Sequence, residues 1–504
     1  MSKNNQNLKE LKKRLIEIRH LSSAAAVLSY DQEVFMPIKG SEKRAQTLSH
    51  LSGIIHTTFV NIDHDNLLTN LKADLDAGKY KGDDAVIVAE VWRDFIREKK
   101  LPESFVRELS ETTSQAQTIW AQARKKSDFK LFQPWLEKIV ELKRKEARYV
   151  GYKDSPYDAL LDTYEPGMTA AEASMILHDV KDFLVPLIAK IKKSQQKFNL
   201  KKILGNFPLA EQIEFNTFIA KKLGFDTEAG RIDVSTHPFT NNFHAHDVRF
   251  TTRYDVKNLL YAIGSTIHET VHALYEQGIK EEYFGTPLGD SISLGIHESQ
   301  SRMWENMIGK SKAFWKYFYP HVQKRFPKPF KKISLDEFYQ IVNYAEPSLI
   351  RVESDEVTYN LHIVIRFEIE KELIEGTIEV KDVPQVWNHK VKDYLGIKVP
   401  KDAVGVLQDV HWSCGLFGYF PTYSFGNLYA AQFYKALKRD IPDLEKKMAQ
   451  GNFKIILDWL RKYIHEHGKR YSASGLVQAV TGAPLSAHHF KDYITKKYSD
   501  IYKL

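Results

Sequence analysis

The sequence predicts a mostly α-helical protein that forms one large body with a small β-sheet. Apolar residues recur at three- and four-residue steps in most segments, which is the pattern of helices with one buried face. The chain has only 18 prolines in 504 residues, and they mostly mark boundaries between these segments. No repeat of fixed period and no Gly/Ser-rich or Pro-rich linker divides it. We therefore predict a single domain over residues 1–504, although length alone would suggest about three units.

The helical pattern is clear from the start of the chain. The opening segment carries an apolar stripe made of Leu8, Leu11, Leu15, Ile18 and Leu21. We interpret this stripe as a core-packing face rather than a partner-binding surface. The same spacing predicts helices over residues 84–99, 131–148 and 171–196.

Residues 230–254 break this pattern. Ile232 and Val234 alternate with polar residues, and Val248 to Thr252 is rich in β-branched and aromatic types. Alternation with a period of two is typical of a half-buried strand. We expect a small sheet here, directly ahead of another helical segment.

Composition excludes several classes of protein. Hydrophobic residues make up 43% of the chain and charged residues 27%, which fits a globular protein and argues against disorder. No run of about 18 uncharged apolar residues appears, so we expect no membrane partner. The net charge of +8 comes from 72 basic and 64 acidic residues in mixed-sign segments. This mixing favours a solvated surface over a nucleic-acid site.

Two features bear on the cellular compartment. Cys414 is the single cysteine, so the chain cannot form an internal disulfide. The first 21 residues are polar and charged and lack the apolar core of a secretory signal. Both features lead us to expect a cytoplasmic protein.

Residues 259–278 carry the strongest chemical signal. They read LLYAIGSTIHETVHALYEQG, with apolar residues at helical spacing and Gly278 as the expected stop. His268 and His272 are four residues apart, so both project from one face of the predicted helix. Two neutral imidazoles placed in this way can bind one zinc ion. Glu269 follows the first histidine and can act as a general base toward water at that metal.

A catalytic zinc ion usually takes a third protein ligand and leaves one position open. Glu298 lies in a second helical stretch, residues 293–306, and would complete a site of two histidines and one glutamate. His297 is adjacent, but neighbours on a helix point about 100° apart, so only one of them can face the zinc. Tyr275 and Gly278 stand where a metzincin would have glycine and a third histidine, which favours the glutamate form.

The sequence resembles the carboxypeptidase Taq family of metallocarboxypeptidases over nearly its whole length. Its motifs stand in family order: DQEVFMP (31–37), YDALLDTYEPGMT (157–169), HPF (237–239), DVRFTTR (247–253), HETVH (268–272), HESQSRMWEN (297–306), IRVESDEVTYNLH (350–362) and GVLQDVHWSCGLFGYFPTYSFGN (405–427). Two departures are slight. Tyr30 stands where the family commonly has tryptophan, and Ser354 stands where alanine is commoner.

The resemblance implies a long helical body split by a deep cleft, similar to neurolysin and angiotensin-converting enzyme. It implies release of single residues from a peptide C-terminus, with broad specificity and poor action at proline. It also implies a cytoplasmic homodimer that is active with zinc or cobalt. By motif, the metal ligands are His268, His272 and Glu298, the base is Glu269, and the catalytic part spans approximately residues 230–430.

An exopeptidase must recognise a free carboxylate, and the planar fork of arginine pairs with both carboxylate oxygens. The candidates are Arg249, Arg253 and Arg351, each of which could instead be an internal ion-pair partner. Arg351 is preferred to Arg249, because strand alternation turns one of two neighbouring side chains away from the cleft.

Negative charge that develops on oxygen during peptide hydrolysis needs hydrogen-bond donors, each contributing on the order of 3 kcal/mol. His411 and Tyr423 are the candidates, in an aromatic segment whose glycines permit close backbone approach. Neurolysin-like enzymes use a histidine and a tyrosine from a corresponding late segment. Tyr419 is the rival of Tyr423, and cleft-wall packing is the alternative for all three. His237 could line the cleft.

A zinc-bound histidine nearly always has a partner for its second ring nitrogen. Asp290, Asp355 and Asp409 are the candidates for that role, and a backbone carbonyl is the alternative. Two other functions stay open. The same zinc chemistry suits an endopeptidase, and a catalytically silent helical binding protein could keep the metal for structure.

Overall fold

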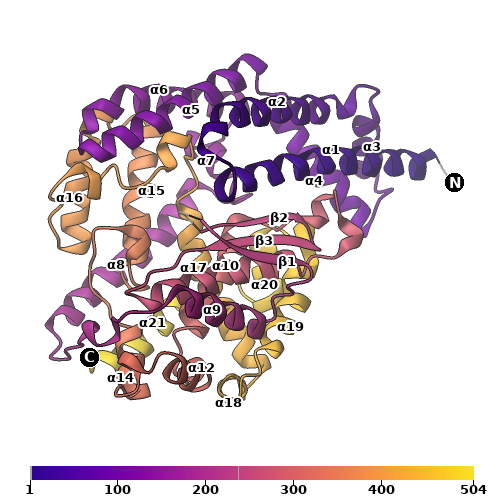
Figure 1. Ribbon diagram of the computed structural model, residues 1–504. Coiled ribbons are helices and arrows are strands. Elements are labelled where there is room, and N and C mark those ends of the chain that lie inside the picture. The colour runs from indigo at the N-terminus through magenta and orange to yellow at the C-terminus, as the bar shows by residue number, and fades with distance from the viewer. Residues whose placement is uncertain (1–2, 236–237) are drawn as a thin grey trace.

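Helices form most of the chain in the computed structural model, which describes residues 3–235 and 238–504 (Figure 1). The helices of this part of the chain are α1 (Lys3–Val34), α2 (Ser41–Val60), α3 (Leu67–Asp76), α4 (Gly82–Lys99), α5 (Glu103–Lys126), α6 (Phe129–Val150), α7 (Pro156–Leu161), α8 (Ala170–Lys193), α9 (Leu209–Leu223), α10 (Leu259–Glu276), α11 (Leu294–Arg302), α12 (Lys312–Arg325), α13 (Pro327–Phe330), α14 (Leu335–Val342), α15 (Tyr359–Glu375), α16 (Val383–Leu395), α17 (Pro421–Asp440), α18 (Leu444–Ala449), α19 (Lys454–Tyr463), α20 (Ala473–Thr481) and α21 (His488–Tyr502). None of them is long and apolar enough to cross a membrane.

The predicted helices over 84–99, 131–148 and 171–196 are confirmed. They are α4, α6 and α8, and their ends differ from the predicted ones by three residues or fewer. The helix predicted over 259–278 is α10, which ends at Glu276, two residues before Gly278. Gly278 is needed for another reason: a Cβ atom there would lie 2.7 Å from Nδ1 of His465.

A three-stranded sheet lies beside α10, where the alternating pattern predicted it. Its strands are β1 (Gly230–Val234), β2 (Thr240–His244) and β3 (Asp247–Thr252), in the order β1-β3-β2. β3 runs parallel to β1, with Val248 opposite Gly230, and antiparallel to β2. Both β2 and β3 pack on α10. The sheet therefore supplies side chains to one flank of that helix.

The N-terminal helices have a smaller core of their own. Leu8, Leu11 and Leu15 of α1 are buried against leucines of α3 and apolar residues of α4, which confirms the stripe as a core-packing face. α1 also lies along the sheet (Figure 1). There the Ser23 hydroxyl donates a 2.9 Å hydrogen bond to the Phe243 carbonyl oxygen, and the Tyr30 hydroxyl donates to the Asp233 carboxylate at 2.6 Å.

Helices α11 and α17 pack extensively against each other in the main core. α11 begins after Ser293, whose hydroxyl accepts a 3.1 Å hydrogen bond from the backbone of Ile296. A Cβ atom on Gly426 of α17 would lie 2.6 Å from Cγ of Glu298 and 2.8 Å from its Cβ. Since only glycine fits here, α17 backs directly onto the part of α11 that carries Glu298.

This packing predicts that one methyl group added at Gly426 destabilises the folded chain. Replacing Gly426 by alanine should lower the free energy of unfolding by about 1–3 kcal/mol, because the added carbon overlaps the Glu298 side chain. Gly264 of α10 is the matched control, since no atom lies within 4 Å of its added Cβ. Gly264→Ala should be neutral or stabilising by about 0.5–1 kcal/mol. Equal unfolding midpoints for both variants in denaturant titrations would show that this contact is not tight.

Candidate metal centre

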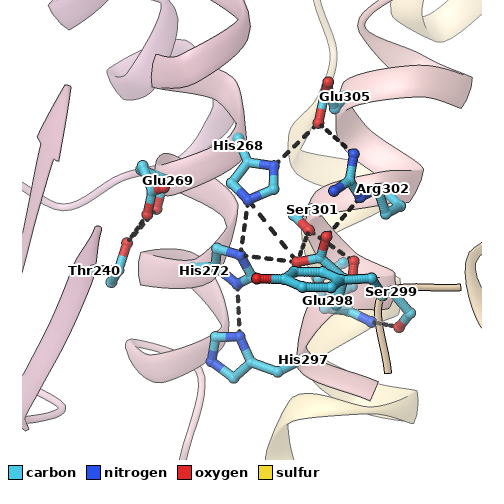
Figure 2. A network of polar contacts seen from close by, with 12 residues as sticks. Thr240, His268, Glu269, His272, His297, Glu298, Ser299, Ser301, Arg302 and Glu305 are labelled. Carbon is cyan, nitrogen blue, oxygen red and sulfur yellow. Dashed lines mark hydrogen bonds and ion pairs between the residues drawn. The ribbon is translucent and has the colours of Figure 1, made fainter. Parts of the chain in front are cut away.

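His268 and His272 project from one face of α10 toward Glu298 of α11 (Figure 2). The two Nε2 atoms are 3.3 Å apart. Oε2 of Glu298 lies 3.5 Å from Nε2 of His272 and 3.9 Å from Nε2 of His268. In the described part of the chain, these three residues form the one group of histidine, cysteine or acidic side chains close enough to share a metal ion.

These distances fit a small tetrahedral cation. Zinc bonds of about 2.0–2.2 Å to nitrogen and oxygen place tetrahedral ligands roughly 3.3–3.6 Å from each other. The three separations are close to that range. His297, the rival candidate, lies on the far side of His272, with its Nδ1 atom 2.6 Å from Nδ1 of that residue. The structure therefore groups Glu298, not His297, with the two histidines.

The charges around the site also favour a cation. Glu269 and Glu298 are buried, and Arg302 and Glu305 are largely covered. Nε of Arg302 donates a 2.6 Å hydrogen bond to Oε1 of Glu298, and Nη1 of Arg302 lies 3.6 Å from Glu305. With both imidazoles neutral, as metal binding requires, three carboxylates and one guanidinium leave two negative charges, which one divalent ion would neutralise.

The pKa values of the cluster follow from the same charges. Burial raises the pKa of Glu305, but its hydrogen bond to His268 and the charge of Arg302 bring it to about 2. Burial lowers the pKa of His268, but the charge of Glu298 and the hydrogen bond to Glu305 outweigh it and raise the pKa to about 9. Burial lowers the pKa of His272 to about 3, so its imidazole is neutral. The cluster thus attracts positive charge and keeps one imidazole ready to bind it.

Glu305 is the partner of His268, and sequence reasoning missed it. Its Oε2 atom lies 3.0 Å from Nδ1 of His268. The signal was present: Glu298, Arg302 and Glu305 are spaced by four and seven residues, so they share a helix face. Glu305 lies in the first turn of a π-helical segment, Met303–Ile308, that continues α11.

None of the three candidate aspartates contacts the second ring nitrogen of His268 or His272. Asp290 pairs with Arg19 at 3.2 Å, and Asp355 accepts a 2.8 Å hydrogen bond from the Thr358 hydroxyl. Asp409 pairs with arginines. All three aspartates are near the motifs in sequence but bind other groups in space.

Glu269, the predicted base, points toward the sheet. Its Oε2 atom accepts a 2.7 Å hydrogen bond from the hydroxyl of Thr240 on β2 (Figure 2). Burial raises the pKa of Glu269, although the charge of His268 and the bond from Thr240 lower it. A carboxylate with a raised pKa is a stronger base than an ordinary one.

His411, Tyr423 and Arg351 lie together next to the metal centre. Nε2 of His411 is 3.3 Å from the Tyr423 hydroxyl, and the Arg351 guanidinium lies 5.0 Å from the centre of the Tyr423 ring. Arg351 also donates a 3.0 Å hydrogen bond to the Tyr359 hydroxyl. The guanidinium of Arg302, which binds Glu298, also lies over the Tyr359 ring, 4.2 Å from its centre. The ring of Tyr359 therefore separates Arg351 from Arg302. The rival Tyr419 packs on Tyr423, with ring centres 5.4 Å apart.

Arg351 is also an ion-pair partner, as the alternative interpretation held. Its Nη2 atom donates to Oδ1 of Asp409 at 2.9 Å, and Nε of Arg366 donates to Oδ2 at 2.7 Å. Both arginines are buried. Burial raises the pKa of Asp409, but the charges of Arg351 and Arg366 hold it far below its usual range. Two guanidinium groups share one carboxylate, so one positive charge is left over beside Tyr423.

The remaining candidates have contacts elsewhere. Nε of Arg249 donates to Asp247 at 2.7 Å, and its guanidinium covers the ring of Phe243. Arg253 is exposed and lies over Tyr261. These contacts place both arginines on the sheet and its margin. His237 lies outside the described residues.

A buried carboxylate, Glu370, fastens the segment that carries His411. It accepts hydrogen bonds from the Tyr157 hydroxyl at 2.7 Å, from Nε1 of Trp412 at 2.8 Å and from the backbone of Gly418 at 3.1 Å. Burial raises the pKa of Glu370 to about 7, despite these three donors. The segment from His411 to Gly418 is therefore held to α15 by one side chain.

Comparison with known proteins gives one consistent result. Residues 10–498 match the family described as carboxypeptidase Taq (M32) metallopeptidase. Carboxypeptidase 1 of Bacillus subtilis is 41% identical over 98% of this chain and 99% of its own. Thermostable carboxypeptidase 1 of Thermus thermophilus is 40% identical over 99% of this chain and 98% of its own. A solved structure of Pyrococcus furiosus carboxypeptidase superposes with a TM-score of 0.93, at 37% identity, over 99% of both chains.

Glu370 should make stability depend on pH. Its pKa in the folded chain, about 7, exceeds its ordinary value of 4.5, so the folded state binds the proton more tightly. Its contribution is complete below pH 4.5 and is lost as the pH rises through 7, by about 3 kcal/mol. Glu370→Gln should flatten the fall in unfolding free energy between pH 5 and 7, measured in denaturant. If the slope of unfolding free energy against pH is the same in the variant and the wild type, Glu370 is ionised in the folded chain throughout this pH range.

Proposed function

Starting from the finding that this chain belongs to the carboxypeptidase Taq family of metallocarboxypeptidases, we propose that it is a zinc enzyme releasing single amino acids from peptide C-termini. The observation that carries the proposal is the convergence of His268, His272 and Glu298, with the ligand spacing and negative charge that suit one divalent ion. Cobalt is the expected substitute, since it accepts the same ligands.

The three ligands would hold one zinc ion per chain. When bound, zinc lowers the pKa of a water molecule and polarises the scissile carbonyl group. The protein contributes the orientation of the ligands: Arg302 and the Ser301 hydroxyl each hold one oxygen of Glu298, at 2.6 and 3.0 Å. Glu305 holds His268 in the same way.

Glu269 is the proposed general base. It would take a proton from the attacking water and return it to the nitrogen of the departing amino acid. Burial raises the pKa of the Glu269 carboxylate. The hydroxyl of Thr240 binds its Oε2 atom, so the other oxygen would accept the proton from water. General acid–base catalysis of this kind contributes about 100- to 10,000-fold in rate.

Arg351 is the proposed receptor for the substrate carboxylate. The surplus positive charge of the Arg351–Asp409–Arg366 group supports this role, because a buried net charge attracts a counter-ion. Its place one ring away from Arg302 suits a terminal residue whose peptide bond reaches the metal. An endopeptidase, the competing function, would have no use for such a receptor.

His411 and Tyr423 are the proposed donors to the developing oxyanion. Burial raises the pKa of the Tyr423 hydroxyl well above its usual value, so it stays protonated and can donate at neutral pH. The 3.3 Å contact with His411 keeps the two groups together. Tyr419 would then pack behind Tyr423.

Several finer points stay predictions. The deep cleft and the likeness to neurolysin, broad specificity with weak action at proline, and a cytoplasmic homodimer are what the family resemblance implies. The absence of a nucleic-acid partner is predicted from the mixed-sign charges, and the single domain from the lack of linkers and repeats. A catalytic part over 230–430 and a role for His237 in lining the cleft also stay predictions.

Glu269→Gln tests the catalytic role directly. The variant should bind zinc as tightly as the wild type and lose about 100- to 10,000-fold in kcat, because the amide cannot accept the proton. Glu282→Gln, at an exposed position, is the matched control and should keep full activity. Unchanged turnover in Glu269→Gln would refute the base. Zinc binding without any peptidase activity in the wild type would favour the silent binding protein.

A peptide and its C-terminally amidated twin separate the exopeptidase from the endopeptidase. The free acid should be cleaved with kcat/KM about 10- to 100-fold higher, the value of a charge-assisted hydrogen bond. Arg351→Lys should narrow this difference, since lysine lacks the planar fork. Arg249→Lys should leave it intact. Equal cleavage of both peptides by the wild type would contradict release from the C-terminus.

A further inference from the structure

We infer that Glu276 and His297 form a hydrogen-bonded relay that fixes the tautomer and orientation of His272, so that its Nε2 atom is free to bind the metal. Both would be positioning residues that never touch substrate. This inference rests on the metal site of the proposed function, and it concerns how the ligand His272 is oriented.

The relay is continuous over four side chains. Nδ1 of His272 lies 2.6 Å from Nδ1 of His297, and the two rings stack with centres 4.6 Å apart (Figure 2). Nε2 of His297 lies 2.8 Å from Oε1 of Glu276, in the last turn of α10. The other oxygen of Glu276 accepts a hydrogen bond from the Asn242 side chain on β2.

Counting protons gives the direction of each hydrogen bond. In the inferred relay, the Nε2–H group of His297 donates to the carboxylate of Glu276. Nδ1 of His297 then accepts the Nδ1 proton of His272. The lone pair of His272 therefore stands on Nε2, the atom that faces Glu298. His268 reaches the same state by donating from Nδ1 to Glu305.

Electrostatics explains why the imidazole of His297 lies between His272 and Glu276. Glu269, Glu298 and Glu305 already surround the site, and Arg302 pairs with two of them. A carboxylate bound directly to Nδ1 of His272 would add a further buried charge there. His297 instead moves that charge one ring farther out, where Asn242 can stabilise it.

The place of His297 in the sequence follows from this geometry. It precedes Glu298 on α11, so its side chain points about 100° away from the ligand, toward the other side of His272. The Tyr275 ring packs edge-on against it, with centres 4.9 Å apart. A second buried histidine, His465, lies against the same tyrosine at 4.7 Å, and its Nε2 atom contacts Gln300 at 3.1 Å.

Metal affinity, measured with zinc and with cobalt by competition against a chelator, tests the relay. His297→Leu should weaken binding about 10- to 100-fold, the usual effect of losing an orienting partner. His297→Gln should recover most of the loss, because its amide can accept from His272 and donate to Glu276. His465→Leu is the matched control: it removes a buried imidazole from Tyr275 without touching His272, and should keep wild-type affinity.

Nitrogen NMR of histidine-labelled, zinc-loaded wild-type protein gives a second readout that needs no variant. His272 should carry its proton on Nδ1. A proton on Nε2 of His272 would overturn the relay, as would an affinity of His297→Leu within twofold of the wild type. If His297→Gln binds the metal as weakly as His297→Leu does, His297 serves packing alone. A wild type that binds neither metal would instead overturn the proposed function, and the relay with it.

Discussion

The burial of three carboxylates against one arginine is the constraint on which this molecule is built. Glu269, Glu298 and Glu305 come from two neighbouring helices, and Arg302 pairs with Glu298 and Glu305. Burying an ion costs several kcal/mol unless it is paired. With both imidazoles neutral, the arrangement is balanced when a divalent cation joins it. We therefore expect a bound metal ion to stabilise the packing of these helices.

The sheet matters because two of its side chains hold carboxylates of α10. Thr240 and Asn242 are two residues apart, so they share one face of β2. They donate to Glu269 and Glu276, which are seven residues apart and share one face of α10. A single register of strand on helix thus fixes the proposed base and the end of the proposed relay together. On the other flank, Gly426 lets α17 press directly on Glu298.

Local patterns were enough to predict the helices, the small sheet and the three candidate ligands. Periods of 3.6 and 2 are local, and the spacing of His268 and His272 needs no tertiary information. Glu305 was within reach of the same reasoning but was overlooked. The surroundings of Arg351 could not be predicted in this way, because Asp409 and Arg366 are distant from it in sequence and come close only in the folded chain. The candidate aspartates failed for the same reason, since their partners are also set by the fold, and no sequence pattern pointed to Thr240.

Anomalous diffraction from crystals of the zinc-loaded protein, recorded on both sides of the zinc absorption edge, would locate the metal ion among its ligands. One peak per chain should lie within about 2.0–2.2 Å of Nε2 of His268, Nε2 of His272 and Oε2 of Glu298. A peak bound by His297 in place of Glu298, or no peak between α10 and α11, would contradict the account of the metal centre.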